Sequence, residues 1–536
     1  MTPDTQGYLT HRQILVVMGG LMVGMFLSAL DQSIVGTALP RITSELGGLD
    51  KLSWVVTAYL LTATASTPLW GKISDLYGRR LLFQIAIVTF LIGSVLAGFS
   101  QDINQLIAFR AVQGLGGGGL MALAMATIGD VIPPRERGRY QGYFAAVFGT
   151  SSVLGPVLGG WFADGPGWQW IFWINLPLGI AALVVTSAAL RIPHVRRDHT
   201  IDYLGAAVIV ASVTSILLYT AWAGPELGWG SQTGLVLLVG GLVLAVVFVL
   251  VELRATEPII PMRLFRSSIF SIANLFGFLI GMAMFGAMIF IPVYLQVVDG
   301  MSPTESGLAM VPMVVGIFTT SILAGQLMSR TGRYRRYPIM GASVVTVALF
   351  LLSRLDNSTP YWIAGVSMYV MGLGLGLTMQ VLIVVVQNSV DRSDMGVATS
   401  SVAFFRQMGG SFGTALFGAI LSTRLGMHLG EATREAPPAA IAALEGQDLH
   451  AVAENVQLIN ALPEPLHGLV TEAFSLALHD VFLAAVPLTL IALVAALFLK
   501  EVPLAERDPA QTSSSIPGSN AGSPSAADST GSPTSV

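Results

Sequence analysis

The chain of 536 residues contains no cysteine, and Asp, Glu, Lys and Arg together make up only 11% of it. Without cysteine there are no disulfides, no thiol catalysis and no cysteine-ligated metal. The net charge is −4 and no basic block is present, so nucleic acid is not expected as a partner. The seven histidines lie outside the interior of the apolar runs, with no metal-ligand cluster and no Ser/His/Asp arrangement. We therefore expect no enzyme, no metal site and no cofactor.

Hydrophobic residues, in contrast, make up 53% of the chain, and the mean hydropathy is +0.70. Apolar runs long enough to cross the ~30 Å hydrocarbon core of a bilayer recur along its whole length. We therefore expect an all-α polytopic membrane protein with fourteen spans. The expected spans are 14–38, 52–72, 81–100, 104–129, 140–162, 169–190, 203–222, 233–252, 270–297, 305–328, 338–355, 361–388, 396–423 and 476–499. The first run lacks a small-residue cleavage site and is expected to be retained.

Basic residues predict the orientation of these spans. Most of the 27 Lys and Arg residues fall in loops on the side of the N-terminus, which the positive-inside rule assigns to the cytoplasm. An even number of spans places both 1–13 and the tail 501–536 there, in a protein of the cell membrane. The tail is rich in Ser, Pro and Gly and is expected to be disordered. The external stretch 425–475 is expected to form one or two short helices, as a gate or as a passive structured loop.

The sequence carries an internal repeat. The segment GKISDLYGRR at 71–80 has a related copy, GQLMSRTGRY, at 325–334, and the glycine pair Gly155 and Gly159 has a copy at the same offset. Such repeats around a central substrate site are typical of secondary transporters. The expected domains are an N-terminal six-helix bundle at 14–190, a linker with two extra transmembrane helices at 191–268, and a C-terminal six-helix bundle at 269–500.

Four segments together resemble one known family. They are LDQSIVGTALP, GKISDLYGRR, RAVQGLGGGG and GTSSVLGPVLGGWF, the last followed by WQWIFWINLP. In this order and spacing they resemble the major facilitator superfamily, and within it the fourteen-helix drug:proton antiporter branch, over residues 10–500. The resemblance implies the major facilitator fold and export of small molecules in exchange for protons.

The first GKISDLYGRR copy lies in an expected cytoplasmic turn. Asp75 and Arg79 are four residues apart, within reach of one another in a helical turn; Gly78 suits a tight reversal, and Gly71 begins the segment. Asp75 is also suited to accept from the N–H groups that begin a neighbouring helix. The resemblance implies a latch that closes the cytoplasmic side. The alternative is that Arg79 and Arg80 are topological anchors only.

Two glycine-rich segments read differently. GLGGGG at 114–119 matches a nucleotide-loop spacing but lies inside an apolar span, so we reject a nucleotide site. GPVLGG contains Gly155, Pro156, Gly159 and Gly160; the small residues allow close helix contact and the proline favours a kink. Ordinary helix packing explains this segment from its residues alone. The resemblance implies the helix-packing motif of antiporters.

Asp31 is the acid that lies well inside an expected span. Charges in this position are costly and are functional candidates by default. Arg110 lies at about the same depth in the fourth span, and Gln113 shares its helix face. Burial disfavours a charged carboxylate and a nearby guanidinium favours it, so Asp31 is suited to carry a proton in a solvent-accessible hollow, with Arg110 tuning it. The alternative is a structural ion pair.

Few charges in the spans imply a largely apolar cavity, suited to lipophilic compounds, including cations that Asp31 itself binds. Phe278, Met282 and Phe285 of the ninth span are candidate substrate contacts, although such residues more often pack against lipid or other helices. Arg406, the second buried charge, is expected to have a cavity-facing structural role.

Three functions are consistent with these residues. The first is a proton-driven exporter of lipophilic drugs or toxic compounds. The second is a dedicated exporter of one endogenous product, such as a lipid, a peptide, a siderophore or an antibiotic. A membrane receptor or enzyme is the third, without support from any motif. The expected partners are a small-molecule substrate, protons and membrane lipid, and the expected state is a monomer.

Overall fold

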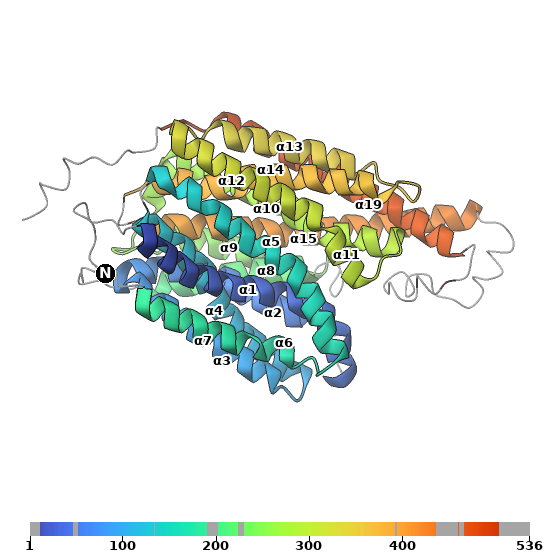
Figure 1. Cartoon of the computed structure of the whole chain (residues 1–536), viewed down its shortest axis with the longest axis horizontal. Helices are drawn as coiled ribbons and strands as arrows, with labels where there is room; N and C mark the ends of the chain where they lie inside the picture. Colours follow the sequence, from blue (N-terminus) through green and yellow to red (C-terminus); the bar gives the residue numbers. More distant parts are fainter. Residues whose placement is uncertain are drawn as a thin grey trace, which may run out of the picture.

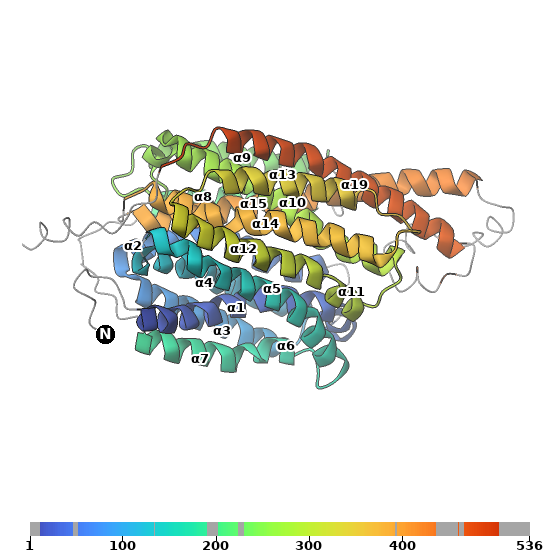
Figure 2. The same ribbon diagram turned by 45° about the horizontal axis from the view of Figure 1, so that its top comes forward.

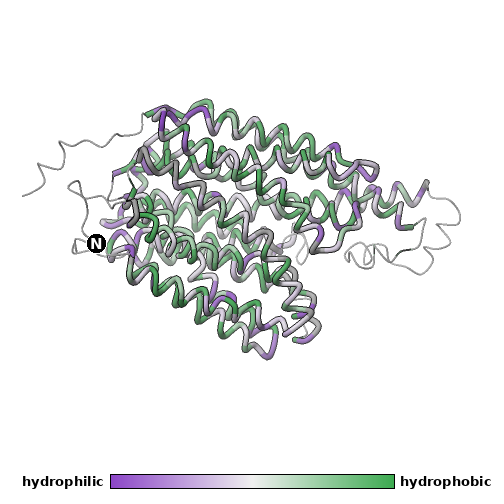
Figure 3. Tube along the Cα trace, viewed as in Figure 1, coloured by the Kyte–Doolittle hydropathy of each residue, from purple (hydrophilic) through white to green (hydrophobic). Residues whose placement is uncertain are grey.

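The computed structural model describes residues 11–46, 52–132, 134–189, 202–222, 230–391, 394–435, 459, 462 and 466–502. As predicted, this part of the chain is helical. Its helices run side by side along the long axis of the molecule (Figures 1 and 2). Hydrophobic residues follow the helices through their middle, and hydrophilic residues gather near their ends (Figure 3). The N-terminal segment before residue 11 and the tail after residue 502 lie outside the described residues.

The first seven helices come from the N-terminal third of the chain. They are α1 (His11–Leu46), α2 (Leu52–Tyr77), α3 (Arg79–Gly98), α4 (Ile103–Val131), α5 (Pro134–Asp164), the short α6 (Trp170–Trp173) and α7 (Asn175–Ala189). Two helices and one 3-10 turn follow, namely α8 (Tyr203–Trp222), α9 (Gln232–Glu252) and η2 (Met262–Arg266).

The remaining helices form the second large group. They are α10 (Ser268–Val293), its π-helical continuation η3 (Tyr294–Val298), α11 (Pro303–Ala309), α12 (Val311–Thr331), α13 (Arg336–Leu352), α14 (Tyr361–Asn388), α15 (Met395–Glu435) and α19 (Leu466–Leu497). By length and composition, ten helical segments among the described residues are suited to cross a membrane.

The two large groups pack in the same pattern. In the first, α1 packs against α5 and α7, while α4 packs against α2 and α3. In the second, α10 packs against α15 and α19, while α14 packs against α12 and α13. The repeated turns also match, because Gly78 (φ 95°) and Gly332 (φ 66°) both adopt the left-handed region that favours glycine. The internal repeat of the sequence thus has a counterpart in the packing.

The two groups contact one another through α5 with α12 and through α2 and α4 with α15. The pair α8 and α9 packs on one flank, where α8 contacts α2 and α15. Along α9, apolar side chains are exposed, for example Val236 at 65% and Val246 at 61%. An apolar surface of this extent is typical of a helix that faces lipid.

Local sequence determines several helix ends. The Asp102 carboxylate accepts hydrogen bonds from the backbone N–H groups of Asn104 (2.9 Å) and Gln105 (3.0 Å), and so caps α4. Ser302 and Glu305 form a reciprocal capping box at the start of α11.

We call the end of the bundle at which α1 begins the proximal end, and the opposite end the distal end.

At the distal end the structure describes only parts of the predicted external segment 425–475, so its short helices stay a prediction. Helix α15 continues without interruption to Glu435, α19 begins at Leu466, and both extend beyond the other helices (Figures 1 and 2). An apolar cluster joins these extensions to η3; its members include Val297, Leu429, Val470 and Phe474. The extensions are therefore continuous with α15 and α19 and bury apolar surface against each other. Residues 436–458 lie outside the described part.

Glycines set the spacing between the repeated helix pairs. A Cβ atom at Gly155 of α5 would collide with Ser33 of α1, and one at Gly409 of α15 would collide with the backbone oxygen of Phe278 on α10. Gly160, by contrast, has no atom within 4 Å of a Cβ built on it. Gly155 therefore fits the predicted helix-packing motif, and Gly160 does not pack closely. The side chain of Pro156 lies outside the described residues.

Helix α15 offers a matched test of this packing. We expect Gly409→Ala to destabilise the protein by about 1–3 kcal/mol, because the added methyl group meets backbone that cannot move aside easily. Gly418→Ala on the same helix has open space around the new methyl group and should change stability by less than about 0.5 kcal/mol. Thermal unfolding of the purified full chain measures both. Equal losses for the two variants would contradict close packing at Gly409.

Candidate functional site

The buried acid of α1 lies in a hydrogen-bonded network. Asp31 Oδ2 accepts from Arg110 Nη1 at 2.5 Å, while Oδ1 accepts from Gln113 Nε2 at 2.7 Å and from Asn175 Nδ2 at 3.1 Å. Asp31 is 0% exposed and Arg110 1%. The structure thus brings Asp31, Arg110 and Gln113 together, and both carboxylate oxygens have partners.

Other groups orient the guanidinium of Arg110. It donates to the Gln113 side-chain oxygen at 2.7 Å and to the Val55 carbonyl at 3.3 Å. It also lies over the Tyr59 ring, 4.4 Å from the centroid. The Tyr59 hydroxyl in turn shares a 2.9 Å hydrogen bond with Ser28. A cation held by these contacts stays charged, since arginine does not deprotonate in proteins.

Asn175 is a functional candidate that the sequence analysis missed. It donates to Asp31 and to Ser94 Oγ (3.0 Å), and its side-chain oxygen is buried without a hydrogen-bond partner among the described residues. The available signal was the amide Asn175 within the apolar run IFWINLP of the WQWIFWINLP segment. An amide in that position requires polar partners, and these come from α1 and α3, far away in sequence.

The location of Asp31 differs from the expectation of a solvent-accessible hollow between the halves. Its partners come from α4 and α7, so the network lies inside the first group of helices. Gln113 and Asn175 are also 0% exposed. In this conformation the carboxylate is closed off from both ends of the bundle, because α1, α4 and α7 pack around it.

A second network lies at the proximal end. The Asp75 carboxylate accepts from the backbone N–H groups of Gly396 (3.2 Å) and Val397 (3.1 Å), in the first turn of α15. Its partner Arg79 contacts it at 2.5 Å and also donates to Asp130 at 2.7 Å. Asp75 therefore accepts from the start of a neighbouring helix, as the sequence analysis anticipated. We call Asp75, Arg79, Asp130 and the first turn of α15 the latch network.

Burial affects the pKa of Asp75, the latch-network carboxylate that lies just beyond the expected span 52–72. Desolvation raises the pKa of Asp75 to about 6, even though Arg79 opposes this rise. Gly71 also belongs to this contact, because a Cβ on it would collide with Ser400 of α15. Arg80 is exposed and lies outside the network, which corrects its assignment to the latch.

The linker between the two large groups also reaches the latch network. Lys72 pairs with Glu257 at 2.8 Å, and Arg263 makes a bidentate pair with Asp394, at 2.7 and 2.9 Å. Asp394 directly precedes α15. The sequence analysis missed both ion pairs, because each joins residues more than a hundred positions apart.

The candidate substrate contacts of α10 lie apart from Asp31. Phe278 and Met282 meet the glycines Gly409 and Gly413 of α15, and Phe285 meets Gly410. They therefore occupy the interface between α10 and α15, within the second group of helices. The structure does not bring them together with the Asp31 network.

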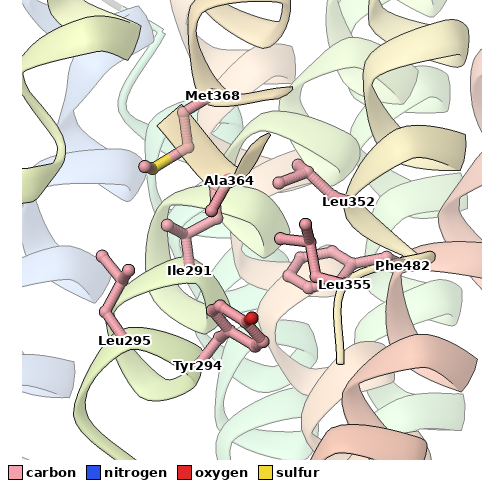
Figure 4. A pocket seen from close by; sticks show the side chains of 8 residues that line it. All are labelled: Ile291, Tyr294, Leu295, Leu352, Leu355, Ala364, Met368 and Phe482. Atoms are coloured by element: carbon pink, nitrogen blue, oxygen red, sulfur yellow. The ribbon is translucent and has the colours of Figure 1, made fainter. Parts of the chain in front are cut away.

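Figure 4 shows a small apolar recess in the second group of helices, at its distal end. Its lining residues are Ile291, Tyr294, Leu295, Leu352, Leu355, Ala364, Met368 and Phe482. None of the predicted site residues belongs to this lining, so we assign it no role in transport. Within the described residues, no group of three His, Asp or Glu side chains is arranged to hold a metal ion.

The helical architecture and the buried ion pair define a transport protein of the membrane. Comparison with known proteins then specifies the family. The model of the Major Facilitator Superfamily matches residues 21–414, and the chain belongs to this family.

Several relatives carry transporter names. An uncharacterised MFS-type transporter of Mycobacterium tuberculosis is 42% identical over 494 residues, which cover 92% of this chain and 70% of the relative. The multidrug transporter protein MdtP of Bacillus subtilis is 40% identical and covers 80% of this chain and 78% of its own. Multidrug resistance protein 3 of the same organism is 32% identical, and the match covers 90% of this chain and 94% of the relative.

Two solved structures are similar in fold. The human organic anion transporter MFSD10 has a TM-score of 0.58 at 13% identity and covers 89% of this chain and 99% of its own. The proton:xylose symporter XylE has a TM-score of 0.58 at 15% identity, over 91% and 96%. The chain is therefore a multi-span membrane transporter with the major facilitator fold, and not an enzyme.

The latch network yields a test in which adjacent arginines serve as variant and control. The chain has no natural cysteine, so Ser400→Cys introduces a single label site at a fully buried position beside Gly71. In this background we expect Arg79→Gln to raise the rate of maleimide labelling by about tenfold or more, because removing one partner of a buried ion pair costs about 3–5 kcal/mol. Arg80→Gln should leave the rate unchanged. Equal rates in both variants would contradict the latch.

Proposed function

We propose that this transporter exports lipophilic compounds, drugs or toxic molecules among them, in exchange for protons. Under this proposal the protein belongs to the fourteen-helix drug:proton antiporter branch. The count of fourteen combines the ten apolar helical segments with four further long helices of the same bundle, α2, α5, α13 and α15. The substrate is a small molecule, and the working unit is a monomer surrounded by membrane lipid.

The proposed division of the chain follows the repeated packing. Two six-helix bundles at 14–190 and 269–500 move relative to one another, and 191–268 adds a helix pair on one flank. Both termini face the cytoplasm, in the cell membrane, which the distribution of Lys and Arg supports. The proximal end is then cytoplasmic, and its intact latch network corresponds to a state closed on the cytoplasmic side.

The proposal of proton coupling depends on one observation, the Asp31 network. Two opposite charges without solvent contact are stable only while both are present and well paired. Protonation of Asp31 removes one of them and leaves Arg110 without its counter-ion, so it changes the balance between conformations of the bundle. Charge neutralisation at one carboxylate is therefore linked to movement of the helices that hold it.

The unpaired amide oxygen of Asn175 fits this cycle. A protonated carboxyl group becomes a donor and requires an acceptor. Rotation of the Asn175 amide by a half turn, which exchanges its oxygen and nitrogen, would turn that oxygen toward Asp31. Asn175 is thus suited to accept from the neutral acid and to donate to the charged one, which lowers the cost of both states.

Loss of the titratable group should separate transport from the proton gradient. The probes are 4-(1-pyrenyl)butanesulfonate and 4-(1-pyrenyl)butyltrimethylammonium, whose charges do not change with pH. In inside-out vesicles with an acidic interior, the natural chain should accumulate at least one probe, and a protonophore should abolish the accumulation. Asp31→Asn should exchange the same probe without accumulating it, because the side chain no longer binds and releases a proton.

Glu45→Gln on the same helix is the matched control, because Glu45 lies at the exposed distal end of α1 with 41% of its side chain accessible. This variant should retain accumulation. Undiminished accumulation by Asp31→Asn would refute the role of Asp31 in coupling.

A further inference from the structure

One charge within an expected span, that of Arg406, has no counter-ion among the described residues. Arg406 lies in α15, eleven residues after its first residue Met395, and within the expected span 396–423. Its backbone packs directly against Gly281 of α10, and its side chain is partly buried. Among the described residues no carboxylate pairs with it.

This isolation sets Arg406 apart from the other buried arginines. Arg79 is paired with Asp75 and Asp130, and Arg110 is paired with Asp31. A guanidinium stays protonated in any protein environment, so Arg406 cannot escape its cost by losing charge. A cation inside a membrane is costly unless partners stabilise it. Such a residue is therefore a functional candidate by default.

A polar group without a partner adjoins it in the chain. The Gln407 side-chain oxygen is buried and has no hydrogen-bond partner among the described residues. One helical turn further, Gly409 faces the backbone of Phe278 and Gly410 faces the ring of Phe285, both on α10. An unpaired cation and an unsatisfied amide therefore lie one turn from an aromatic ring, all on the pair α10 and α15.

Asp31, the buried acid of the first group of helices, is already occupied by hydrogen-bond donors, unlike Arg406. Both oxygens of Asp31 already accept hydrogen bonds from Arg110, Gln113 and Asn175. A cationic substrate would have to break that network to reach the carboxylate. The charge that remains available to a substrate is thus positive.

We propose that Arg406 binds the acidic group of the transported compound, so that the preferred substrates are lipophilic organic anions such as carboxylates or sulfonates. This inference rests on the proposed export function and specifies its substrate class. The planar guanidinium matches a carboxylate or sulfonate in geometry and charge. The Gln407 amide adds a donor through its Nε2 group, and Phe285 contacts the apolar body. The assignment replaces the lipophilic cations expected from the sequence.

Binding of three probes with one apolar body tests this assignment. The full chain in lipid nanodiscs is dialysed to equilibrium against the pyrenylbutyl sulfonate, the trimethylammonium compound, or the neutral 4-(1-pyrenyl)butan-1-ol, with empty nanodiscs as background. The natural chain should bind the sulfonate about tenfold more tightly than the other two, which corresponds to about 1.4 kcal/mol. Arg406→Gln should bind all three with similar affinity, and Arg406→Lys should retain part of the preference.

The controls separate recognition of charge from a structural role. Arg424→Gln lies on the same helix, at a side chain that is 50% exposed, and should keep the full preference. Gln407→Glu places a negative charge beside Arg406 and should weaken sulfonate binding while strengthening that of the ammonium probe. A purely structural Arg406 would instead change the affinity of all three probes together. That result overturns the inference, and so does a natural chain without preference for the sulfonate, even if no Arg406 variant folds.

The inference and the proposed function fail separately. Asp31→Asn should keep the sulfonate preference, because it leaves Arg406 unchanged. If no probe is accumulated by a proton gradient but the preference depends on Arg406, the proposed coupling falls and the anion site stands. If the ammonium probe is accumulated and Arg406→Gln has no effect on binding, the coupling stands and the anion site falls.

Discussion

A carboxylate and a guanidinium that share one solvent-free site impose the main constraint on this molecule. Asp31 and Arg110 come from α1 and α4, and each is stable in the interior only because the other is present. Gln113, Asn175 and the ring of Tyr59 complete the site, so two further helices, α7 and α2, must keep their positions. A change of charge at one atom therefore acts on the packing of a whole bundle, which is the property that a coupled transporter requires.

The two networks lie at different positions in the molecule, one deep inside a helix bundle and one at its proximal end. The Asp31 network lies inside the first group of helices, while the latch network joins that group to the second group at α15. The linker contributes the pairs Lys72–Glu257 and Arg263–Asp394 at the same end. Opening of the proximal end thus requires the separation of backbone N–H groups from Asp75 and a rearrangement of charges that belong to the linker. Close glycine contacts hold α10 and α15 of the second group against each other.

Helix α15 connects these features along its length. Its first turn binds Asp75, its middle carries Arg406 and the glycines that meet α10, and its last turns pack against α19 through Leu429. A ligand bound near Arg406 would therefore contact the same rigid element whose start is held by the latch. On the proposed anion site, one helix thus connects the bound substrate with the closed end.

Much of this could be predicted from the sequence, because the relevant signals are local or come from strong physical penalties. Apolar run length determines where helices cross a membrane, a charge in such a run demands a partner, and the GKISDLYGRR turn announces a tight reversal with an acid and a base four residues apart. Contacts between distant segments were decided by tertiary structure alone. These include Asn175 on Asp31, the linker ion pairs, the extension of α15 to Glu435, the exclusion of Arg80 from the latch network, and the isolation of Arg406. Each depends on which helix faces which across the bundle, and a one-dimensional pattern of hydrophobicity does not contain that information.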